Sequence, residues 1–431
     1  MEDVRAKALK EWQEARFGMF IHWGAYSVGG LDCIKMQDMG VPVQEYVNRF
    51  AKKFNPTKYD ANEFARVAKD GGAKYVVMGS RHHDGFCLWN TKTTKYSSVN
   101  MKPKRDFIAE YVEAIRGAGL KVGLYYSMLD WRYKGYWEGP HNNPASWQKL
   151  VALVHEQVRE LMTNYGKIDI LWYDGGWRPW GFEWQWNPSH EELWKVWRAN
   201  ELNEMVRKLQ PHILMNNRCC DDNSTGDFGT PEQQLKPEER PWEMCDNMGY
   251  LWGYAPQDKY RKDPRRILIT LVTCVQYGGN LLLNIGPKPD GSVQKWQART
   301  MKLIGTWLKK HGEAIYGCGK EVHMPLHESL SPWQTTRKSD TLYMHLVNYP
   351  GTEYSVGTIH NYYFISAELL TTGKKLEIIH EPTRDIIRGL PAKSPDPMFP
   401  VVKIKFRERT QEEIKAKRWI GLDNPETEVN Y

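Results

Sequence analysis

The chain has 431 residues, of which 41% are hydrophobic and 26% charged, enough for a large buried core and more than one domain usually holds. Its formal net charge of +7 is spread along the chain, without the basic block interleaved with aromatic residues that is typical of nucleic-acid-binding proteins. We therefore expect two domains and no nucleic-acid partner.

Membrane and disulfide signals are also missing. No apolar run approaches the ~20 residues that cross a bilayer, so we expect no membrane span. The amino-terminal stretch MEDVRAKALKEWQEARFG lacks the hydrophobic core of a signal peptide, which leaves a cytoplasmic protein, or a periplasmic or extracellular one whose signal was removed. Seven cysteines at irregular spacing, including Cys219 next to Cys220, indicate reduced thiols, and the lack of a CxxC pair argues against structural zinc.

Short β-rich runs alternate with helical segments up to about residue 290. The runs are FGMFIHWG, KYVVMGSRHHDG, KVGLYYS, IDILWYDGG, HILMNNR and NLLLNIGP, at 17–24, 74–85, 121–127, 168–176, 212–218 and 280–287. Amphipathic stretches at 61–72, 105–120 and 147–166 lie between them. This alternation predicts a parallel sheet. Because the runs are continuously apolar, the strands must be buried on both faces of the sheet, which favours a (β/α)8-like TIM barrel formed by residues 1–319. The active site of such a barrel lies at the carboxyl ends of its strands.

The last third of the chain has another character. After EAIYGCG the helical stretches fade, and four β-rich runs alternate with turns. They are TLYMHLVNY, YYFISAELLTT, KLEIIHE and VVKIKFRER. This spacing predicts a C-terminal antiparallel β-sandwich at residues 320–431.

Chemistry-bearing residues gather at the predicted strand ends. They are His22, His82, His83, Tyr125 or Tyr126, Trp172, Asp174, Arg218 and Asn284. The side-chain period of two places Trp172 and Asp174 on the same face of their strand. Histidines, aromatic planes, an arginine and a carboxylate around one pocket suit a sugar, which presents both hydroxyls and apolar C–H faces.

A glycosidase needs a second carboxyl group besides Asp174, because one must attack or activate water while the other protonates the leaving oxygen. The segment GDFGTPEQQLKPEERPWEMC, residues 226–245, is rich in Gly, Pro and charge and predicts a long loop over the barrel mouth. It offers four candidates, Glu232, Glu238, Glu239 and Glu243.

Other interpretations of these residues stay open. Asp174 alone would fit a helix N-cap, and His22 alone would fit a hydrogen-bonded core histidine. A barrel metallohydrolase built on His82, His83 and Asp84 is an alternative, although adjacent residues of a strand point to opposite sides and share one ion poorly. A sugar-binding lectin without turnover is another alternative, which the presence of two carboxylates argues against.

Six motifs, taken in order, resemble the α-L-fucosidases of glycoside hydrolase family 29. They are RFGMFIHWG, RHHDGFCLW, GLYYSMLDW, ILWYDGG, PWEMC followed by LWGY, and GGNLLLNIGPKPDG. The resemblance covers residues 12–318, and the C-terminal part is similar to that family's β-sandwich. It implies a retaining exo-glycosidase that releases terminal α-L-fucose from fucosylated oligosaccharides or glycans, with neither a metal nor an organic cofactor. Asp174 resembles the family's nucleophile, which forms a covalent fucosyl-enzyme.

The resemblance also implies roles for other residues. The positions similar to the family's fucose-binding set are His22, Glu45, Tyr46, His82, His83, Tyr125, Trp172 and Arg218, and Trp252 is similar to the aromatic residue that packs on the C5 methyl group. Two positions depart from the family pattern. Tyr46 stands where Trp is common, and Arg81 stands where Lys is usual, an exchange that we expect to be neutral. DFGTPEQ resembles the segment that carries the acid/base, so we predict Glu232 in that role. Glu243 is the alternative, or else organises the pocket wall. The resemblance predicts neither the linkage preference nor the oligomeric state.

Overall fold

The computed structural model describes residues 2–33, 40–176, 189–219, 226–321, 333–357, 362–381 and 383–413. The chain divides into two compact units. The first comprises residues 1–267 and 279–306, and the second comprises residues 268–278 and 307–431. The domain limits expected from the sequence, 1–319 and 320–431, remain a prediction.

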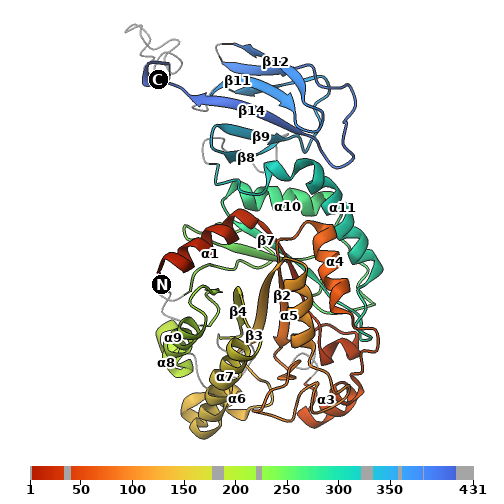
Figure 1. Ribbon diagram of the computed structural model, residues 1–431, viewed down its shortest axis with the longest axis vertical. Helices are drawn as coiled ribbons and strands as arrows, with labels where there is room; N and C mark the ends of the chain where they lie inside the picture. Colours follow the sequence, from red (N-terminus) through yellow and green to blue (C-terminus); the bar gives the residue numbers. More distant parts are fainter. Residues whose placement is uncertain are drawn as a thin grey trace, which may run out of the picture. The chain divides into compact units, whose positions relative to one another are not determined.

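A parallel sheet forms the centre of the first unit (Figure 1). Its seven strands follow the order β5-β4-β3-β2-β1-β7-β6, and each pairs in parallel with its neighbours. The strands are β1 (Phe17–Ile21), β2 (Tyr75–Arg81), β3 (Lys121–Ser127), β4 (Ile170–Asp174), β5 (Leu214–Met215), β6 (Glu243–Asn247) and β7 (Asn280–Ile285). Because a parallel connection requires a crossover, a helical or irregular segment lies between successive strands.

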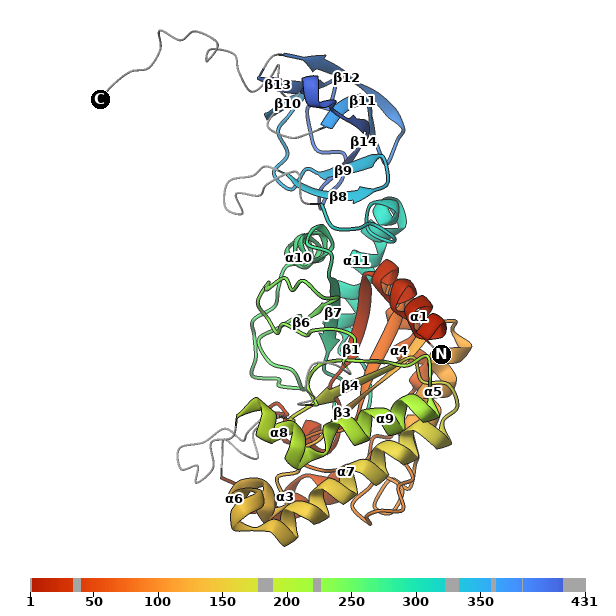
Figure 2. The ribbon, with the colours of Figure 1, turned by 90° about the vertical axis from the view of Figure 1, so that its left-hand side faces the viewer.

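Helices lie on the outside of this sheet (Figure 2). The first unit contains α1 (Glu2–Ala15), α3 (Val43–Arg49), α4 (Ala61–Gly71), α5 (Phe107–Gly117), α6 (Lys134–Asn142), α7 (Pro144–Asn164), α8 (His190–Trp197) and α9 (Ala199–Leu209), and short 3-10 turns at Ala25–Gly29 and Ala51–Lys53. Two further helices, α10 (Pro264–Gln276) and α11 (Lys295–His311), continue from the first unit into the second.

Local sequence signals explain several helix ends. Asp60 accepts a hydrogen bond from the backbone of Asn62 at the start of α4, and Asp106 accepts one from Ala109 at the start of α5. Gly72 ends α4 in the left-handed conformation, at a φ of 82°, which a glycine adopts without steric cost. The predicted helical stretches at 61–72 and 105–120 are therefore confirmed, with polar caps and a glycine stop.

An irregular segment occupies the place between the two edge strands, β5 and β6. In residues 227–233 the backbone N–H of Asp227 donates to Met215 (2.7 Å), and Cys245 of β6 donates to Pro231 (3.1 Å). The predicted long loop at 226–245 is thus partly structured: its first part pairs with both edges, and its last residues begin β6. Gly and Pro in DFGTPEQ hide this pairing, because they disrupt the alternation that marks a strand.

Apolar side chains from around the sheet meet in one cluster. It contains Trp12, Phe20, Tyr75, Val77, Tyr125, Ile170, Trp172, Leu214, Phe228, Cys245 and Leu282. Every one of the seven strands contributes, and so does Phe228 of the irregular segment, so the sheet curls around a packed interior as a TIM-like domain does.

The second unit contains a seven-stranded antiparallel sheet in the order β10-β13-β12-β11-β14-β9-β8. The strands are β8 (Gln334–Lys338), β9 (Thr341–His345), β10 (Glu353–Gly357), β11 (Tyr362–Leu369), β12 (Lys374–His380), β13 (Arg384–Arg388) and β14 (Val401–Glu408), preceded by a 3-10 turn at Gly312–Ala314. Leu342 of β9 and Tyr354 of β10 belong to one core cluster although several strands separate them in the sheet. The sheet therefore encloses its core as a β-sandwich does, as the sequence predicted.

Two further expectations concern the chain as a whole. Within the ranges above, no helix combines the length and apolar character that a membrane span requires. The described cysteines are buried and form no disulfide within the described residues: Cys33, Cys87, Cys219, Cys245, Cys274 and Cys318. Cys220 lies outside the described residues.

Candidate functional site

Side chains at the carboxyl ends of the strands converge around Asp174. His22 follows β1 directly, and His82 and His83 follow β2. Tyr125 of β3 lies opposite Trp172 of β4, and the last pair of this register joins Ser127 to Asp174. The parallel register thus brings residues far apart in sequence to one edge of the sheet, as the strand-end pattern predicted.

Asp174 ends β4 in a nearly buried position, with 7% of its surface exposed. Its Oδ2 accepts a hydrogen bond from the hydroxyl of Tyr125 (2.7 Å), and its Oδ1 accepts one from Nη1 of Arg218 (3.1 Å). Nε2 of His83 lies 3.7 Å from Oδ2. Tyr126 instead donates to Gln157 (2.9 Å), so Tyr125 is the tyrosine that faces Asp174. A carboxylate held by two donors keeps a fixed orientation, which an attacking group requires.

Arg218 joins Asp174 to Glu232. Its Nη2 lies 2.9 Å from Oε2 of Glu232, a side chain that is 42% exposed. Nε and Nη2 also donate to the hydroxyl and the carbonyl of Thr230 (2.8 and 2.9 Å), and the guanidinium lies 4.6 Å from the centre of a Trp172 ring. The irregular segment 227–233 carries both Thr230 and Glu232, so its pairing with β5 and β6 fixes the second carboxylate near the first.

The three histidines are buried and neutral. Burial is the main cause that lowers the pKa of His22 and of His83 to about 4, and it lowers that of His82 well below its usual value. Nδ1 of His22 contacts Asn284 and Nδ1 of His83 contacts Ser127, each at 2.7 Å. In His22 and His83 the protein holds one nitrogen of a neutral imidazole, so the other can meet a ligand, and this suits sugar hydroxyls.

Aromatic rings lie beside these polar groups. The rings of Tyr125 and Trp172 stack with centres 5.8 Å apart, and Phe20 lies 5.1 Å from Trp172. Trp252 lies 5.0 Å from His22 and 6.2 Å from Phe20. Aromatic rings, neutral histidines and two carboxylates joined by Arg218 therefore lie together at the strand ends, which is the set of groups that a sugar ring requires.

Glu243 lies deeper than the other carboxylates and is fully buried. Its Oε1 accepts a hydrogen bond from Nε1 of Trp172 (3.1 Å), and its Oε2 accepts one from the hydroxyl of Tyr75. Burial raises the pKa of Glu243 to about 7, against the lowering effect of these two donors. Glu243 thus supports Trp172 from inside the sheet, which favours the role in the pocket wall over that of acid/base.

Glu243 gives stability a predictable pH dependence. Its ordinary pKa of 4.5 applies to the unfolded chain, so its contribution is complete below pH 4.5, falls as the pH rises, and is lost above pH 7. Glu243→Gln cannot ionise. We therefore expect the wild type to lose free energy of unfolding relative to this variant as the pH rises from 4.5 to 7.5, measured by urea unfolding. Glu239→Gln, at an exposed position, is the control. If the difference in free energy of unfolding between the wild type and Glu243→Gln did not change with pH, the prediction would be contradicted.

Glu45 and Tyr46 contact partners other than Asp174. Glu45 lies on α3 with a side chain 51% exposed and pairs with Arg49 at 3.0 Å. Tyr46 is buried, and its hydroxyl donates to Oδ2 of Asp84 (2.8 Å). Burial is the main cause that raises the pKa of Asp84 to about 6. The structure therefore does not bring Glu45 to the carboxylates, and residues 34–39 before this helix lie outside the described residues.

A group of donor atoms that could hold a metal ion lies in the same pocket. One donor atom each from His82, His83 and Asp174 lies within 4.8 Å of the others. This group contains Asp174, whereas the metallohydrolase alternative used Asp84. Arg218 binds Oδ1 of Asp174 and places a positive charge beside any cation in this position, which disfavours a metal centre.

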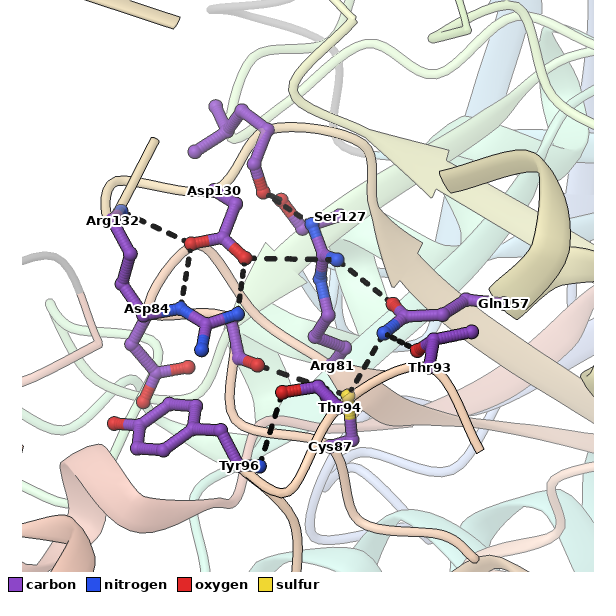
Figure 3. Close-up of polar contacts among 12 residues, drawn as sticks. Arg81, Asp84, Cys87, Thr93, Thr94, Tyr96, Ser127, Asp130, Arg132 and Gln157 are labelled. Carbon is purple, nitrogen blue, oxygen red and sulfur yellow. Dashed lines mark hydrogen bonds and ion pairs between the residues drawn. The ribbon is translucent and has the colours of Figure 1, made fainter. Parts of the chain in front are cut away.

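A buried polar network surrounds Arg81, the last residue of β2 (Figure 3). The guanidinium of Arg81 donates to Gln157 (2.8 Å) and to the carbonyl of Leu129 (2.8 Å), and lies 3.8 Å from Asp130. Arg132 binds Asp130 with two hydrogen bonds of 2.9 and 2.6 Å. Burial alone would raise the pKa of Asp130, but the charges of these two arginines and the hydrogen bonds from Arg132 lower it. The network therefore holds an ionised carboxylate inside the protein.

This network supports the site through the backbone. Ser127, whose hydroxyl contacts His83, donates to the same carbonyl of Leu129 that Arg81 binds (3.1 Å). The backbone N–H of Trp131 donates to the carbonyl of His83 (3.0 Å). Anchoring of residues 127–131 thus orients the imidazole that faces Asp174.

Arg81 is expected to matter for stability. Arg81→Met leaves buried acceptors without a donor and removes one of the two positive charges that balance the negative charge of Asp130. We therefore expect a loss of about 3–5 kcal/mol in the free energy of unfolding, measured with urea. Arg81→Lys keeps the positive charge but cannot bind Gln157 and the carbonyl of Leu129 in one plane. Its free energy of unfolding should therefore fall, but by less than that of Arg81→Met. Unchanged stability of Arg81→Lys would contradict this account and support the expectation that the exchange is neutral.

Three site contributors were missing from the predicted set. Asn284 was noted at a strand end without a role, whereas Ser127 and Thr230 gave no signal, because small hydroxyl residues occur in most turns. Their roles depend on tertiary contacts: Ser127 on His83, and Thr230 on Arg218.

Comparisons with known proteins agree with this geometry. The family model described as Alpha-L-fucosidase matches residues 1–313. An α-L-fucosidase of Dictyostelium discoideum is 29% identical over 356 residues, which are 73% of this chain and 73% of that protein. The structure of α-L-fucosidase isoenzyme 1 from Paenibacillus thiaminolyticus has a TM-score of 0.82 and 32% identity, and the match covers 94% of this chain and all of that one.

A further similar structure shows a trapped state of such an enzyme. It is the structure of a GH29 α-L-fucosidase from Bacteroides thetaiotaomicron, described as a trapped covalent intermediate in complex with 2-fluoro-fucosyl fluoride. Its TM-score is 0.82 and its sequence identity is 27%, and the match covers 93% of this chain and 96% of that one. The family model, the sequence relatives and the solved structures agree, and they agree with the motifs in the sequence. This chain belongs to the α-L-fucosidases of glycoside hydrolase family 29.

Proposed function

We propose that Asp174 is the nucleophile and Glu232 the acid/base of this retaining α-L-fucosidase. The observation that carries the proposal is Arg218, whose two terminal nitrogens lie 3.1 Å from Asp174 and 2.9 Å from Glu232. A retaining glycosidase requires two carboxyl groups close together on either side of the glycosidic bond. One arginine that contacts both supports this assignment.

The reaction has two steps. An oxygen of Asp174 attacks the anomeric carbon of the fucosyl group and forms a C–O bond while the glycosidic C–O bond breaks, and Glu232 gives its proton to the leaving oxygen. Water then attacks the same carbon, Glu232 takes its proton, and the bond to Asp174 breaks to give fucose. Arg218 stays in place through its bonds to Asp174 and Thr230 when Glu232 turns to the leaving group.

Differences in exposure support this division of roles. Asp174 is almost buried at the base of the pocket, where a sugar ring bound on it would be surrounded. Glu232 is 42% exposed, where the leaving group must meet the solvent. Glu243, fully buried under Trp172, has no such access.

The sugar itself would contact the remaining pocket residues. In this proposal His22, His82 and His83 bind ring hydroxyls, Tyr125 and Arg218 orient Asp174, and Trp172 and Trp252 pack on apolar faces. Glu45 and Tyr46 join the set through the family resemblance. The substrates are fucosylated oligosaccharides or glycans, since the catalytic residues bind only the terminal sugar and the leaving group extends towards solvent.

The proposal is tested by fucose release. We expect the wild type to release free fucose from at least one member of a panel of α1,2-, α1,3-, α1,4- and α1,6-fucosylated oligosaccharides, and to do so equally in the presence of a chelator. Release from no member would remove the catalytic proposal and favour a fucose-binding protein. Loss of release with chelator would restore the metal alternative.

A further inference from the structure

Asn284 links two sides of the pocket. Its side chain is buried on β7, where it lies opposite Phe20 of β1 and Asn247 of β6 in the sheet register. Oδ1 of Asn284 lies 2.7 Å from Nδ1 of His22. Its Nδ2 donates to the backbone carbonyl of Trp252 (2.7 Å) and to Oδ1 of Asn247 (3.0 Å). One amide therefore contacts both a histidine and the segment of the aromatic wall.

The contact with Trp252 decides which way the amide points. A backbone carbonyl can only accept a hydrogen bond, so the nitrogen of Asn284 must face it and the oxygen must face His22. The oxygen can only accept, so Nδ1 of His22 carries the proton. Because burial lowers the pKa of His22 to about 4, the ring is neutral at pH 6 to 7, and its Nε2 holds a lone pair. His22 thus presents an acceptor to a sugar hydroxyl.

The same amide restrains the aromatic wall. The backbone N–H of Gly253, next to Trp252, donates to Oδ1 of Asp32 (2.6 Å). The peptide group between Trp252 and Gly253 is therefore held at both ends, by Asn284 at its carbonyl and by Asp32 at its N–H. The Trp252 ring lies 5.0 Å from the ring of His22, so the orientation of the two is set together.

We infer that Asn284 is a positioning residue for sugar selectivity, which fixes the acceptor on His22 and the apolar wall of Trp252 at the same time. This inference rests on the proposed function of the pocket. An acceptor held at a set distance from an apolar wall fits a sugar with a ring hydroxyl next to a methyl group. It disfavours the otherwise identical sugar whose methyl group is replaced by CH₂OH, because the added hydroxyl would face Trp252 without a partner. The α-L-fucoside and the α-L-galactoside form such a pair.

The first experiment compares aryl α-L-fucoside and aryl α-L-galactoside as substrates of the purified full chain. A pocket of this kind discriminates against one added hydroxyl by about 100-fold in kcat/KM. We expect Asn284→Ala to lower this ratio by about 10-fold, with the fucoside KM raised more than kcat is lowered. A ratio equal to that of the wild type in a folded variant would overturn the inference.

Asn280 provides a matched control. It is a buried asparagine four residues earlier on β7, on the same face, and its Nδ2 donates to the carbonyl of Trp12 (2.8 Å). Asn280→Ala should lose stability as Asn284→Ala does but keep the wild-type selectivity ratio. An equal fall of the ratio in both variants would reduce Asn284 to a general structural role and overturn the inference.

Asn284→Asp is a second variant, for use if Asn284→Ala does not fold. It keeps the shape of the side chain and separates the two functions of the amide. The carboxylate still accepts from His22 but cannot donate to Trp252, and its charge favours the protonated imidazole. We expect the fucoside KM of this variant to rise as the pH falls from 8 to 5, since protonation of Nε2 removes the acceptor, while the wild-type KM stays flat. A flat profile in the variant would contradict the inference.

A wild type inactive on both aryl glycosides would instead remove the proposed function and the inference with it.

Discussion

Asp174→Ala is expected to lower kcat on α-L-fucosides by on the order of 10⁴-fold or more, while the variant still binds fucose. The nucleophile is lost, whereas the histidines and aromatic rings that hold the sugar remain. Turnover is measured as fucose release, and fucose binding by calorimetry. The near-isosteric Asp174→Asn should be equally inactive, which separates loss of the nucleophile from loss of packing.

Chemical rescue provides the decisive control for this variant. The missing side chain leaves space at the position of the attacking oxygen, and azide added from solution can occupy it. Azide should restore turnover of an activated aryl fucoside and give a fucosyl azide of inverted configuration. Near-normal turnover of Asp174→Ala without azide would remove Asp174 from the mechanism.

Glu232→Ala is expected to affect substrates according to their leaving group. Natural fucosides have poor leaving groups and need a proton from the general acid, so their kcat/KM should fall by about 10²–10⁴-fold. Aryl fucosides with strongly acidic phenols depart without that proton and should change far less in kcat/KM. The measurement is kcat/KM across a series of aryl fucosides of increasing phenol pKa, with one fucosylated oligosaccharide.

Two glutamates of the same region serve as controls for Glu232. Glu239 is exposed on the segment that follows, and Glu239→Ala should match the wild type on every substrate. Glu243→Ala removes the acceptor of Trp172 and should lower activity on both substrate classes by a similar factor. If Glu243→Ala shows the dependence on leaving group and Glu232→Ala does not, the acid/base is Glu243.

The strand ends were the part of the site that the sequence predicted best. The period of two put Trp172 and Asp174 on one face, and both side chains do meet Arg218 there. The alternation of strands and helices predicted a sheet with its polar residues at one edge, where His83 and Asp174 lie 3.7 Å apart. Such features follow from local periodicity and from the direction of parallel strands, which a sequence displays directly.

Features that depend on tertiary packing were not accessible in the same way. The pairing of residues 227–233 with β5 and β6 involves isolated bridges in a Gly- and Pro-containing segment, which resembles a loop in sequence. The burial of Glu243 under Trp172 depends on curvature of the whole sheet. Asn284 carries no motif of its own, and its orientation follows only from the carbonyl of Trp252.

The central claim, a covalent fucosyl-enzyme on Asp174, is tested most directly by trapping the adduct with 2-fluoro-fucosyl fluoride. Mass spectrometry of the intact chain should show one added 2-fluoro-fucosyl group, and peptide mapping should place it on Asp174. Asp174→Ala should remain unlabelled under the same conditions. A label on another carboxylate, or an active wild type that forms no adduct and releases fucose of inverted configuration, would contradict the account.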